Sequence, residues 1–300
     1  MEEKISFQET HFSLEHNHFN LFLEKIERKD TAKSTLKVPD ILLVHGLTFS
    51  SHQFDVNYQD YSLARFLTKS GARVWLLDIT GYGRSTKPKD GFIVNGKYAS
   101  EDVLAAINFI RQKEKVDKIN VLGWSFGTIS CSLAAAKHPN WINSLILYAP
   151  IHHGLGLPPP QTDYQKFSPL STEDDFQKLP GKNTINPAIT DTNLFNLYRK
   201  QCQMYDGAGS PNGCRKDLFQ SKSVELFKPS LLLIPTLVIA GDQDSYVNWE
   251  KDIPPIMKLL PNPKSKAVEI RGGSHVVMLE KPYHNQFQLE VWNFLMQTQP

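Results

Sequence analysis

The sequence lacks the features that would place the protein across a membrane or on a nucleic acid. It has no apolar run close to the ~20 residues that a membrane-spanning helix needs. Its 33 basic and 31 acidic residues nearly balance and are interspersed, so no polyanion-binding surface is predicted. After residues 1–4 the apolar residues alternate rather than run on, so no secretory signal is predicted and the cytoplasm is the expected location.

Cysteine is scarce, with three residues in 300. Cys131 stands among small residues and is expected to be a buried thiol that packs like a small apolar side chain. Cys202 and Cys214 flank a loop rich in Gly, Asn and Pro at 206–213 and could be bridged, although the expected compartment is reducing. No cysteine or histidine spacing suggests zinc, and neither a metal nor a cofactor is predicted.

Internal repeats and long Gly- or Ser-rich linkers are also missing, and the length suits one large or two small domains. Apolar stretches alternate with helical patterns after an antiparallel start that turns near His16 and Asn17. This predicts an α/β fold, with a mostly parallel eight-stranded sheet and helices on both faces. The expected strands are two within 5–24 and six at 41–44, 74–77, 119–122, 142–148, 236–240 and 267–270. The expected helices of this sheet domain are 61–68, about 100–114, 128–138, about 249–260 and 282–296.

Between about 151 and 234 the alternation breaks down, apart from a short helical run at 194–204. Because this segment is too long for an ordinary connection, it is predicted to be a lid or cap inserted into a core of residues 1–150 and 235–300. His152 and His153 are expected near the pocket mouth, where they could touch substrate. Apolar side chains of the lid could line the pocket, although such residues more often fasten a cap to its domain; they are Phe167, Phe176, Leu194, Phe195, Leu197, Tyr198 and Met204.

One motif organises the rest of the chain, namely Gly-Trp-Ser-Phe-Gly at 123–127. It lies between an expected strand and an expected helix, and in that context Gly-x-Ser-x-Gly indicates a nucleophile elbow at Ser125. The turn is tight enough to strain the serine backbone and to require almost no side chain at Gly123 and Gly127. The helix that begins at the serine would direct its free N–H groups toward negative charge that forms there.

Polar side chains fall at or just past the ends of several expected strands, among them His45, Asp78, Asp244 and His275. In parallel sheets the active groups gather at the carboxyl ends of the strands. A serine hydroxyl needs a neighbouring base, and an imidazole can accept its proton and later release it.

His275 follows the last strand and is the preferred base, with an ordinary loop histidine as the alternative reading. His284 ranks below it, because it falls inside a helical pattern. Asp244, just after strand 236–240, is the preferred partner of that base, since a carboxylate must hold the imidazole tautomer. Asp242 is the alternative and is expected instead to hydrogen-bond the loop backbone.

The order Ser125, Asp244, His275, with His45-Gly46 after an early strand, resembles the α/β-hydrolase superfamily over nearly the whole chain. The resemblance implies an oxyanion hole made by the backbone N–H groups of Phe126 and Leu47, with His45 as a loop organiser. The stretch 57–77 is also similar to acid lipases and polyester synthases. The synthases, however, use cysteine at the elbow, and the acid-lipase turn lacks the Gly-x-Gly found here at 81–83.

The leading hypothesis is therefore a serine hydrolase that cleaves carboxylic esters with an apolar acyl group through an acyl-enzyme. Aspartate-nucleophile relatives are disfavoured because Ser125 holds the elbow. Amide, thioester, lactone and carbon–carbon substrates stay open, because the triad does not choose among leaving groups. A non-catalytic binding or signalling protein on the same scaffold is the alternative of another class. The predicted partner is a small-molecule ester, with no nucleic acid and no integral membrane segment.

Overall fold

The computed structural model describes residues 5–29 and 39–299, and residues 1–4, on which the prediction of no secretory signal partly rests, lie outside that range. An eight-stranded sheet has the order β1-β2-β4-β3-β5-β6-β9-β10. Strands β1 and β2 form an antiparallel hairpin, β2 also pairs antiparallel with β4, and the remaining neighbours are parallel. The strands are β1 Phe7–His16, β2 Phe19–Arg28, β3 Asp40–Val44, β4 Arg73–Asp78, β5 Ile119–Trp124, β6 Ile142–Tyr148, β9 Thr236–Gly241 and β10 Lys266–Ile270. The α/β-hydrolase fold expected from the sequence is confirmed.

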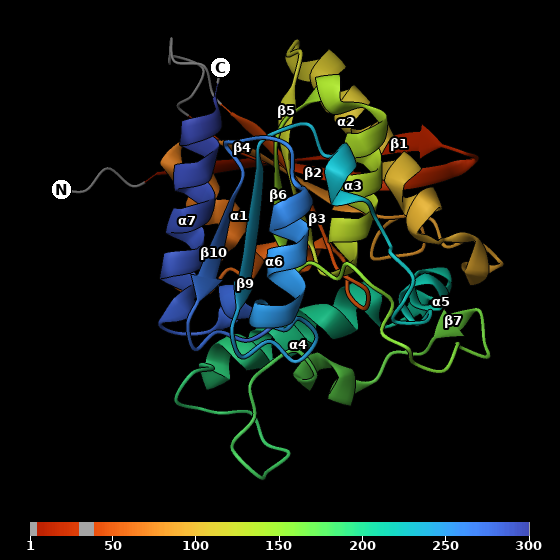
Figure 1. Cartoon of the computed structure of the whole chain (residues 1–300), viewed down its shortest axis with the longest axis vertical. Helices are drawn as coiled ribbons and strands as arrows, with labels where there is room; N and C mark the ends of the chain where they lie inside the picture. Colours follow the sequence, from red (N-terminus) through yellow and green to blue (C-terminus); the bar gives the residue numbers. More distant parts are fainter. Residues whose placement is uncertain (1–4, 30–38, 300) are drawn as a thin grey trace.

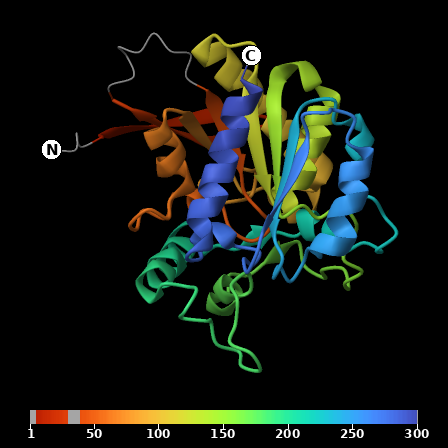
Figure 2. The same ribbon diagram turned by 60° about the vertical axis from the view of Figure 1, so that its left-hand side comes forward.

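Helices cover the sheet on both faces, as Figures 1 and 2 show. Helices α1 (Leu63–Ser70) and α7 (Tyr283–Thr298) lie together on one face, and α2 (Gly96–Glu114), α3 (Phe126–Lys137) and α6 (Trp249–Leu259) lie on the other. Because the central strands are enclosed by both layers, every residue of β3 and β5 is buried. Short 3-10 helices occupy Ser51–Asp55, Gly91–Ile93, Pro139–Trp141, Pro169–Glu173, Pro229–Leu231 and Val277–Leu279.

The beginning of α2 differs from the sequence expectation, which placed its cap near Ser100. The helix begins at Gly96, and the side chain of Asn95 caps it by accepting a hydrogen bond from the Tyr98 amide at 2.9 Å. The Ser100 hydroxyl lies inside the helix and donates back to the carbonyl of Lys97 at 2.7 Å. The sequence therefore correctly predicted a polar N-cap for this helix, but it placed the cap at Ser100 instead of Asn95.

The segment 151–234, which the sequence predicts as an inserted lid, crosses the carboxyl end of the sheet, at the lower side of Figure 1. It contains α4 (Thr192–Asp206), α5 (Gly213–Leu218) and a small ribbon of β7 (Tyr164–Gln165) with β8 (Ser210–Pro211). Its division from the core as a separate unit stays a prediction. Cys202 and Cys214, whose pairing the sequence left open, are both buried free thiols. Within the described residues, no helix combines the length and the apolar character that crossing a membrane would take.

Candidate active site

Ser125 stands at the turn between β5 and α3 in a strained backbone conformation, with φ 54° and ψ −118°. A Cβ added at Gly123 would collide with the carbonyl oxygen of Gly127. A Cβ at Gly127 would lie only 2.5 Å from the carbonyl oxygen of Val44 in β3. The elbow geometry predicted from the glycine spacing is therefore present, and both glycines are required by close backbone contacts.

Ser125 opens into a cavity of about 310 Å³ that His275 and Leu47 also line. Phe126 is the first residue of α3, and the first N–H groups of a helix have no acceptor within it. The loop after β3 passes directly beside the serine, because a Cβ at Gly46 would lie 3.3 Å from Ser125 Cβ. The two backbone segments predicted to hold an oxyanion thus meet at Ser125.

His275 and Asp244 lie together, with His275 Nδ1 2.8 Å from Asp244 Oδ2. The other carboxylate oxygen, Oδ1, accepts hydrogen bonds from the amides of Tyr246 at 2.8 Å and Val247 at 3.1 Å. An ionised carboxylate only accepts hydrogen bonds, so Nδ1 carries the proton and Nε2 is left as the basic nitrogen. Burial alone would lower the pKa of His275, but the charge and hydrogen bond of Asp244, together with the charge of Asp175, raise it.

The backbone of His275 is held by two aromatic side chains. Its carbonyl oxygen accepts hydrogen bonds from Trp124 Nε1 at 3.0 Å and from the Tyr148 hydroxyl at 2.8 Å. Trp124 precedes Ser125 directly, so the nucleophile turn and the histidine loop are joined by one indole. The sequence gave no signal for this role of Trp124 or Tyr148, although Trp124 lies within the motif itself.

Ser125 and His275 line the same cavity, but among the described residues no hydrogen bond joins Ser125 Oγ to the His275 ring. Catalytic hydrogen bonds are often long in ligand-free enzymes and shorten when substrate binds. The structure brings Ser125 and His275 together at one cavity, and Asp244, which does not line the cavity, contacts His275.

The two alternative residues lie elsewhere. His284 is buried in α7, stacks on Tyr61 with ring centroids 4.0 Å apart, and has Nε2 3.3 Å from Asp60. Asp242 accepts a hydrogen bond from the Gly272 amide at 2.6 Å, which is the backbone role expected for it. Neither residue lines the cavity that contains Ser125.

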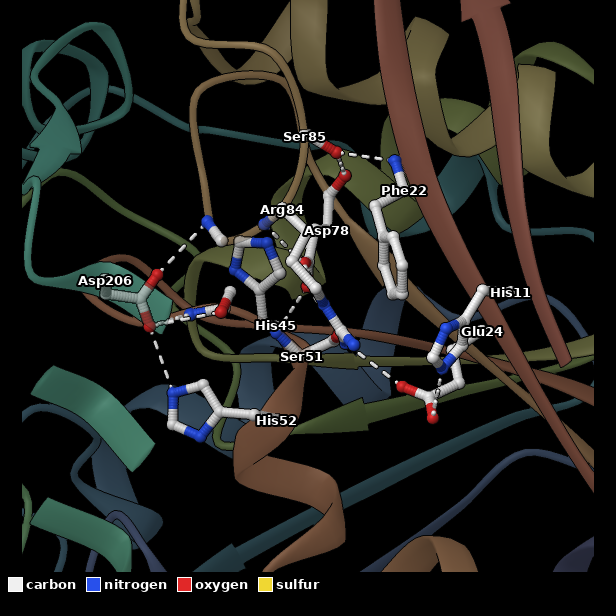
Figure 3. A network of polar contacts seen from close by, with 12 residues as sticks. His11, Phe22, Glu24, His45, Ser51, His52, Asp78, Arg84, Ser85 and Asp206 are labelled. Atoms are coloured by element: carbon white, nitrogen blue, oxygen red, sulfur yellow. Dashed lines mark hydrogen bonds and ion pairs between the residues drawn. The ribbon is translucent and has the colours of Figure 1, made fainter. Parts of the chain in front are cut away.

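A buried polar network holds the loop after β3, as Figure 3 shows. Asp78, at the end of β4, accepts hydrogen bonds from the amide and the hydroxyl of Ser51 at 3.0 and 2.5 Å. His45 Nε2 accepts from the Ile79 amide at 3.1 Å, and His45 Nδ1 lies 2.8 Å from the Gly46 carbonyl. Burial lowers the pKa of His45, so its ring is neutral and acts as a spacer between two backbone segments. This arrangement matches the organising role that the resemblance implied.

Asp206 extends that network into the segment 151–234. The carboxylate lies at the end of α4 and accepts from the amide and hydroxyl of Ser50 at 3.0 and 3.1 Å, and from the Gly83 amide at 3.1 Å (Figure 3). His52 Nε2 lies 3.0 Å from the same carboxylate. The sequence gave no signal for this anchor, because its partners are more than 100 positions away in the chain.

Two further polar residues that line the cavity, Asp175 and Arg215, were not predicted from the sequence. Asp175 lines the cavity beside His275, and burial raises its pKa to about 6, although the charge of His275 opposes the rise. Arg215, in α5, lines the cavity as well. Both residues come from the segment without periodicity, where nothing singled out one polar residue from another.

The apolar residues of segment 151–234 that the sequence singled out do not line the cavity, in agreement with the favoured reading that they fasten the segment. None of the seven apolar lid residues named from the sequence lines it: Phe176, Leu194, Phe195 and Tyr198 are buried, and Met204 is 73% exposed. The buried aromatic residues pack on one another and on Phe49, which is the fastening role. The apolar residues that do line the cavity are Leu47, Phe49, Trp124, Ile151, Leu155, Leu157, Leu218 and Phe219.

His152 and His153 border a second cavity, of about 500 Å³, which shares Ile151, Leu155, Leu157 and Tyr246 with the first. Potential ligand atoms of these histidines and of Glu225 lie within 4.8 Å of one another. His152 Nε2 lies 3.1 Å from the carbonyl oxygen of Phe227, which uses one of its two ring nitrogens for a backbone contact. The expectation that no metal is bound stays a prediction.

A family model described as the alpha/beta hydrolase fold matches residues 39–282. The "Probable lysophospholipase BODYGUARD 2" of Arabidopsis thaliana is 30% identical over 142 residues, which cover 46% of this chain and 27% of that protein. "Lipase member M" of Homo sapiens is 32% identical over 124 residues, which cover 39% of this chain and 29% of that protein.

Structural similarity extends further along the chain than sequence similarity. A solved structure described as a Vigna radiata epoxide hydrolase mutant superposes with a TM-score of 0.68, covering 96% of this chain and 99% of that one at 15% identity. At that identity the likeness concerns the fold. The match to each of the two curated relatives spans less than a third of the relative's own length.

Proposed function

Because this chain belongs to the alpha/beta hydrolase fold family, we propose that it is a serine hydrolase that cleaves carboxylic esters. Ser125 is the nucleophile, His275 the general base and Asp244 the residue that orients the base. One observation carries the proposal: the strained Ser125 turn and a histidine held by a carboxylate at 2.8 Å line a single cavity. The lipase and lysophospholipase names of the two curated relatives support ester chemistry.

The first half of the reaction forms an acyl-enzyme. Ser125 Oγ attacks the ester carbonyl carbon while His275 Nε2 takes the hydroxyl proton. The negative charge that develops on the carbonyl oxygen is stabilised by the backbone N–H groups of Phe126 and Leu47, each worth roughly 100- to 1000-fold in rate. The intermediate then collapses, the carbon–oxygen bond to the alcohol breaks, and His275 returns the proton to the leaving oxygen.

The second half regenerates the enzyme. Water enters, His275 Nε2 takes one of its protons, and the hydroxide attacks the acyl carbon. Collapse of this intermediate releases the carboxylic acid and returns the proton to Ser125. Asp244 keeps the Nδ1–H tautomer throughout and stabilises the imidazolium that forms twice in each turnover.

The acyl group is proposed to be apolar, since Leu47, Ile151, Leu155 and Leu218 contribute much of the lining. Amide, thioester, lactone or carbon–carbon substrates are the second candidates, because the same triad serves each of them. A non-catalytic binding role is a further alternative, and intact elbow glycines argue against it. The cytoplasm stays the predicted location.

Turnover of p-nitrophenyl esters from acetate to palmitate tests the proposal. The wild type is expected to hydrolyse the series with a maximum at one chain length, set by the apolar lining. Ser125→Ala is expected to lose at least about 1000-fold in kcat, because no other group replaces the nucleophile.

Ser132→Ala is the matched control, because Ser132 is also a buried serine and lies farther along α3. It is expected to leave kcat unchanged. Hydrolysis that survives unchanged in Ser125→Ala would exclude the proposed nucleophile. Absence of turnover with every ester would shift the proposal to the other leaving groups or to the binding role.

A further inference from the structure

Arg215 is a buried cation that lines the same cavity as Ser125, and its side chain has an unusual set of partners. The residue is 7% exposed. Nη1 donates to Ser210 Oγ at 3.0 Å, to Asn212 Oδ1 at 3.1 Å and to the Pro211 carbonyl at 3.3 Å. Among the residues that the structure describes, Nη2 donates only to Thr48 Oγ1, at the long distance of 3.4 Å. All four acceptors are uncharged.

The charge of Arg215 is not balanced by a carboxylate. Across the described residues 5–29 and 39–299, no Asp or Glu forms an ion pair with its guanidinium. Burial is the largest influence on the pKa of Arg215 and lowers it, and the side groups that act on it are Tyr82 and Cys214. Burial raises the pKa of the Cys214 thiol to about 12 and raises the pKa of the Tyr82 phenol well above its usual value, so both groups are neutral at pH 7. Arginine itself keeps its charge in a protein.

An unbalanced buried charge is costly, whereas an ion pair with good geometry recovers part of that cost. A guanidinium has five N–H donors in a planar fork that fits two oxygens of a carboxylate or phosphate. The bonds on Arg215 crowd onto Nη1, and among the described residues Nε and the second N–H of Nη2 have no hydrogen-bond acceptor. The N–H groups with the fewest hydrogen bonds are therefore those on the Nε–Nη2 edge of the guanidinium.

The remaining charged groups of the cavity do not neutralise this cation. Asp174 and Asp175 also line the cavity, but neither acts on the pKa of Arg215. Asp175 acts instead on His275. Next to Arg215 in the chain, Leu218 and Phe219 line the cavity with apolar surface. The cavity thus combines a buried cation with an apolar wall, beside the nucleophile.

We infer that Arg215 binds an anionic group of the substrate, a carboxylate or a phosphate, through the Nε–Nη2 edge of its guanidinium. Resting on the proposed ester hydrolysis, the inference makes the substrate an acidic amphiphile: an ester that carries an apolar portion and, away from the scissile bond, a carboxylate or phosphate. The buried cation and the apolar wall each recognise one portion of such a molecule.

Binding without turnover tests the inference separately from catalysis. Hexanoate, hexyl phosphate and hexanol are titrated calorimetrically into the wild type, into Arg215→Met and into Arg215→Lys. At least one of the two anions is expected to bind the wild type more tightly than hexanol, and the tighter of the two identifies carboxylate or phosphate as the natural group. Arg215→Met is expected to lose that preference, whereas Arg215→Lys, which keeps the charge without the fork, retains part of it.

A matched pair of esters provides the kinetic test. Arg215→Met is expected to lower kcat/KM for the p-nitrophenyl monoester of adipic acid by about 10- to 100-fold, the effect of removing charge-assisted hydrogen bonds. For neutral p-nitrophenyl hexanoate the change is expected to stay within about threefold. Arg199→Met is the control, because Arg199 lies in the same segment but pairs with Glu173 at 2.5 Å and lies outside the cavity lining.

Each outcome decides the question. A wild type that binds neither anion more tightly than hexanol overturns the inference, whatever the ester assay gives. An equal loss for the charged and the neutral ester in a folded Arg215→Met would show that Arg215 only holds the loop at 210–212. If no ester is hydrolysed but an anion preference depends on Arg215, the anion site stands and the proposed ester hydrolysis falls.

Discussion

At the scale of single residues, the pKa of the proposed base, His275, is subject to opposing effects. His275 is buried, which favours the neutral ring, while Asp244 and Asp175 favour the imidazolium. Asp244 contacts His275 Nδ1 directly, whereas Asp175 acts on His275 through its charge alone. Asp175 therefore offers a way to change the pKa of His275 without removing its hydrogen-bond partner.

Asp175→Asn is expected to lower the pKa of His275, because it removes a negative charge that stabilises the imidazolium. The base must be neutral to accept a proton, so kcat/KM rises with pH through this pKa. The acid limb of the profile should therefore move to lower pH, by about half a unit to one unit. A pH profile of kcat/KM from about pH 5 to pH 9 measures the shift.

Asp174→Asn is the natural control for that profile. Asp174 lines the same cavity and is the adjacent residue, but it is not among the groups that act on the pKa of His275. The acid limb of the kcat/KM profile of Asp174→Asn should therefore coincide with that of the wild type. Equal shifts in the two variants, or a shift of Asp175→Asn to higher pH, would refute the assigned influence.

At the scale of elements, the loop after β3 connects the sheet to α4 through buried carboxylates. Asp78 holds Ser51 from the sheet side, and Asp206 holds Ser50 and Gly83 from the α4 side (Figure 3). The same loop carries Leu47, whose N–H is proposed to stabilise the oxyanion. The position of that donor therefore depends on the attachment of segment 151–234, which makes the segment part of the proposed catalytic machinery.

Asp206→Asn is expected to lower the free energy of unfolding at pH 7 by about 1–3 kcal/mol, because buried donors lose a charged acceptor. Burial would raise the pKa of Asp206, but the hydrogen bond and charge of His52 and the Ser50 amide bond, among others, together lower it. A carboxylate with a lowered folded-state pKa stabilises the protein above its unfolded value of about 3.9. That contribution is lost as the pH falls through the folded-state pKa.

Urea unfolding at pH 7 and at successively lower pH measures this difference. The wild type should exceed Asp206→Asn at pH 7, and the two should converge in acid. Asp60→Asn, with a carboxylate whose side chain is 62% exposed, serves as the control and should change the free energy of unfolding by less than about 0.5 kcal/mol. A gap between wild type and Asp206→Asn that widens in acid would contradict the account.

At the scale of the whole molecule, the parts that were predictable from sequence are those with local signals. Alternating apolar stretches located the strands, and Gly123 and Gly127 located the elbow, because each signal lies within a few residues of its effect. The α2 start was misplaced because Ser100 and Asn95 are both good caps and only the folded chain selects between them.

The remaining site residues depend on contacts between distant parts of the chain. Asp206 contacts Ser50 and Gly83, Arg215 contacts Thr48, and the charge of Asp175 acts on His275. These residues are far apart in the sequence, and such separations carry no periodic signal. The apolar residues of segment 151–234 that could have lined the cavity pack inside the protein instead, which was the favoured of the two readings. Phe176 and Tyr198 are buried against each other, and composition alone does not separate packing from pocket lining.

The most direct test of the central claim is labelling by a fluorophosphonate probe, with the modified peptide identified by mass spectrometry. Such probes react with an activated serine, so the label is predicted on Ser125 in the wild type and in Ser132→Ala. Ser125→Ala should remain unlabelled. Equal labelling of Ser125→Ala, or a label on any other residue of the wild type, would contradict the assignment of Ser125 as the nucleophile.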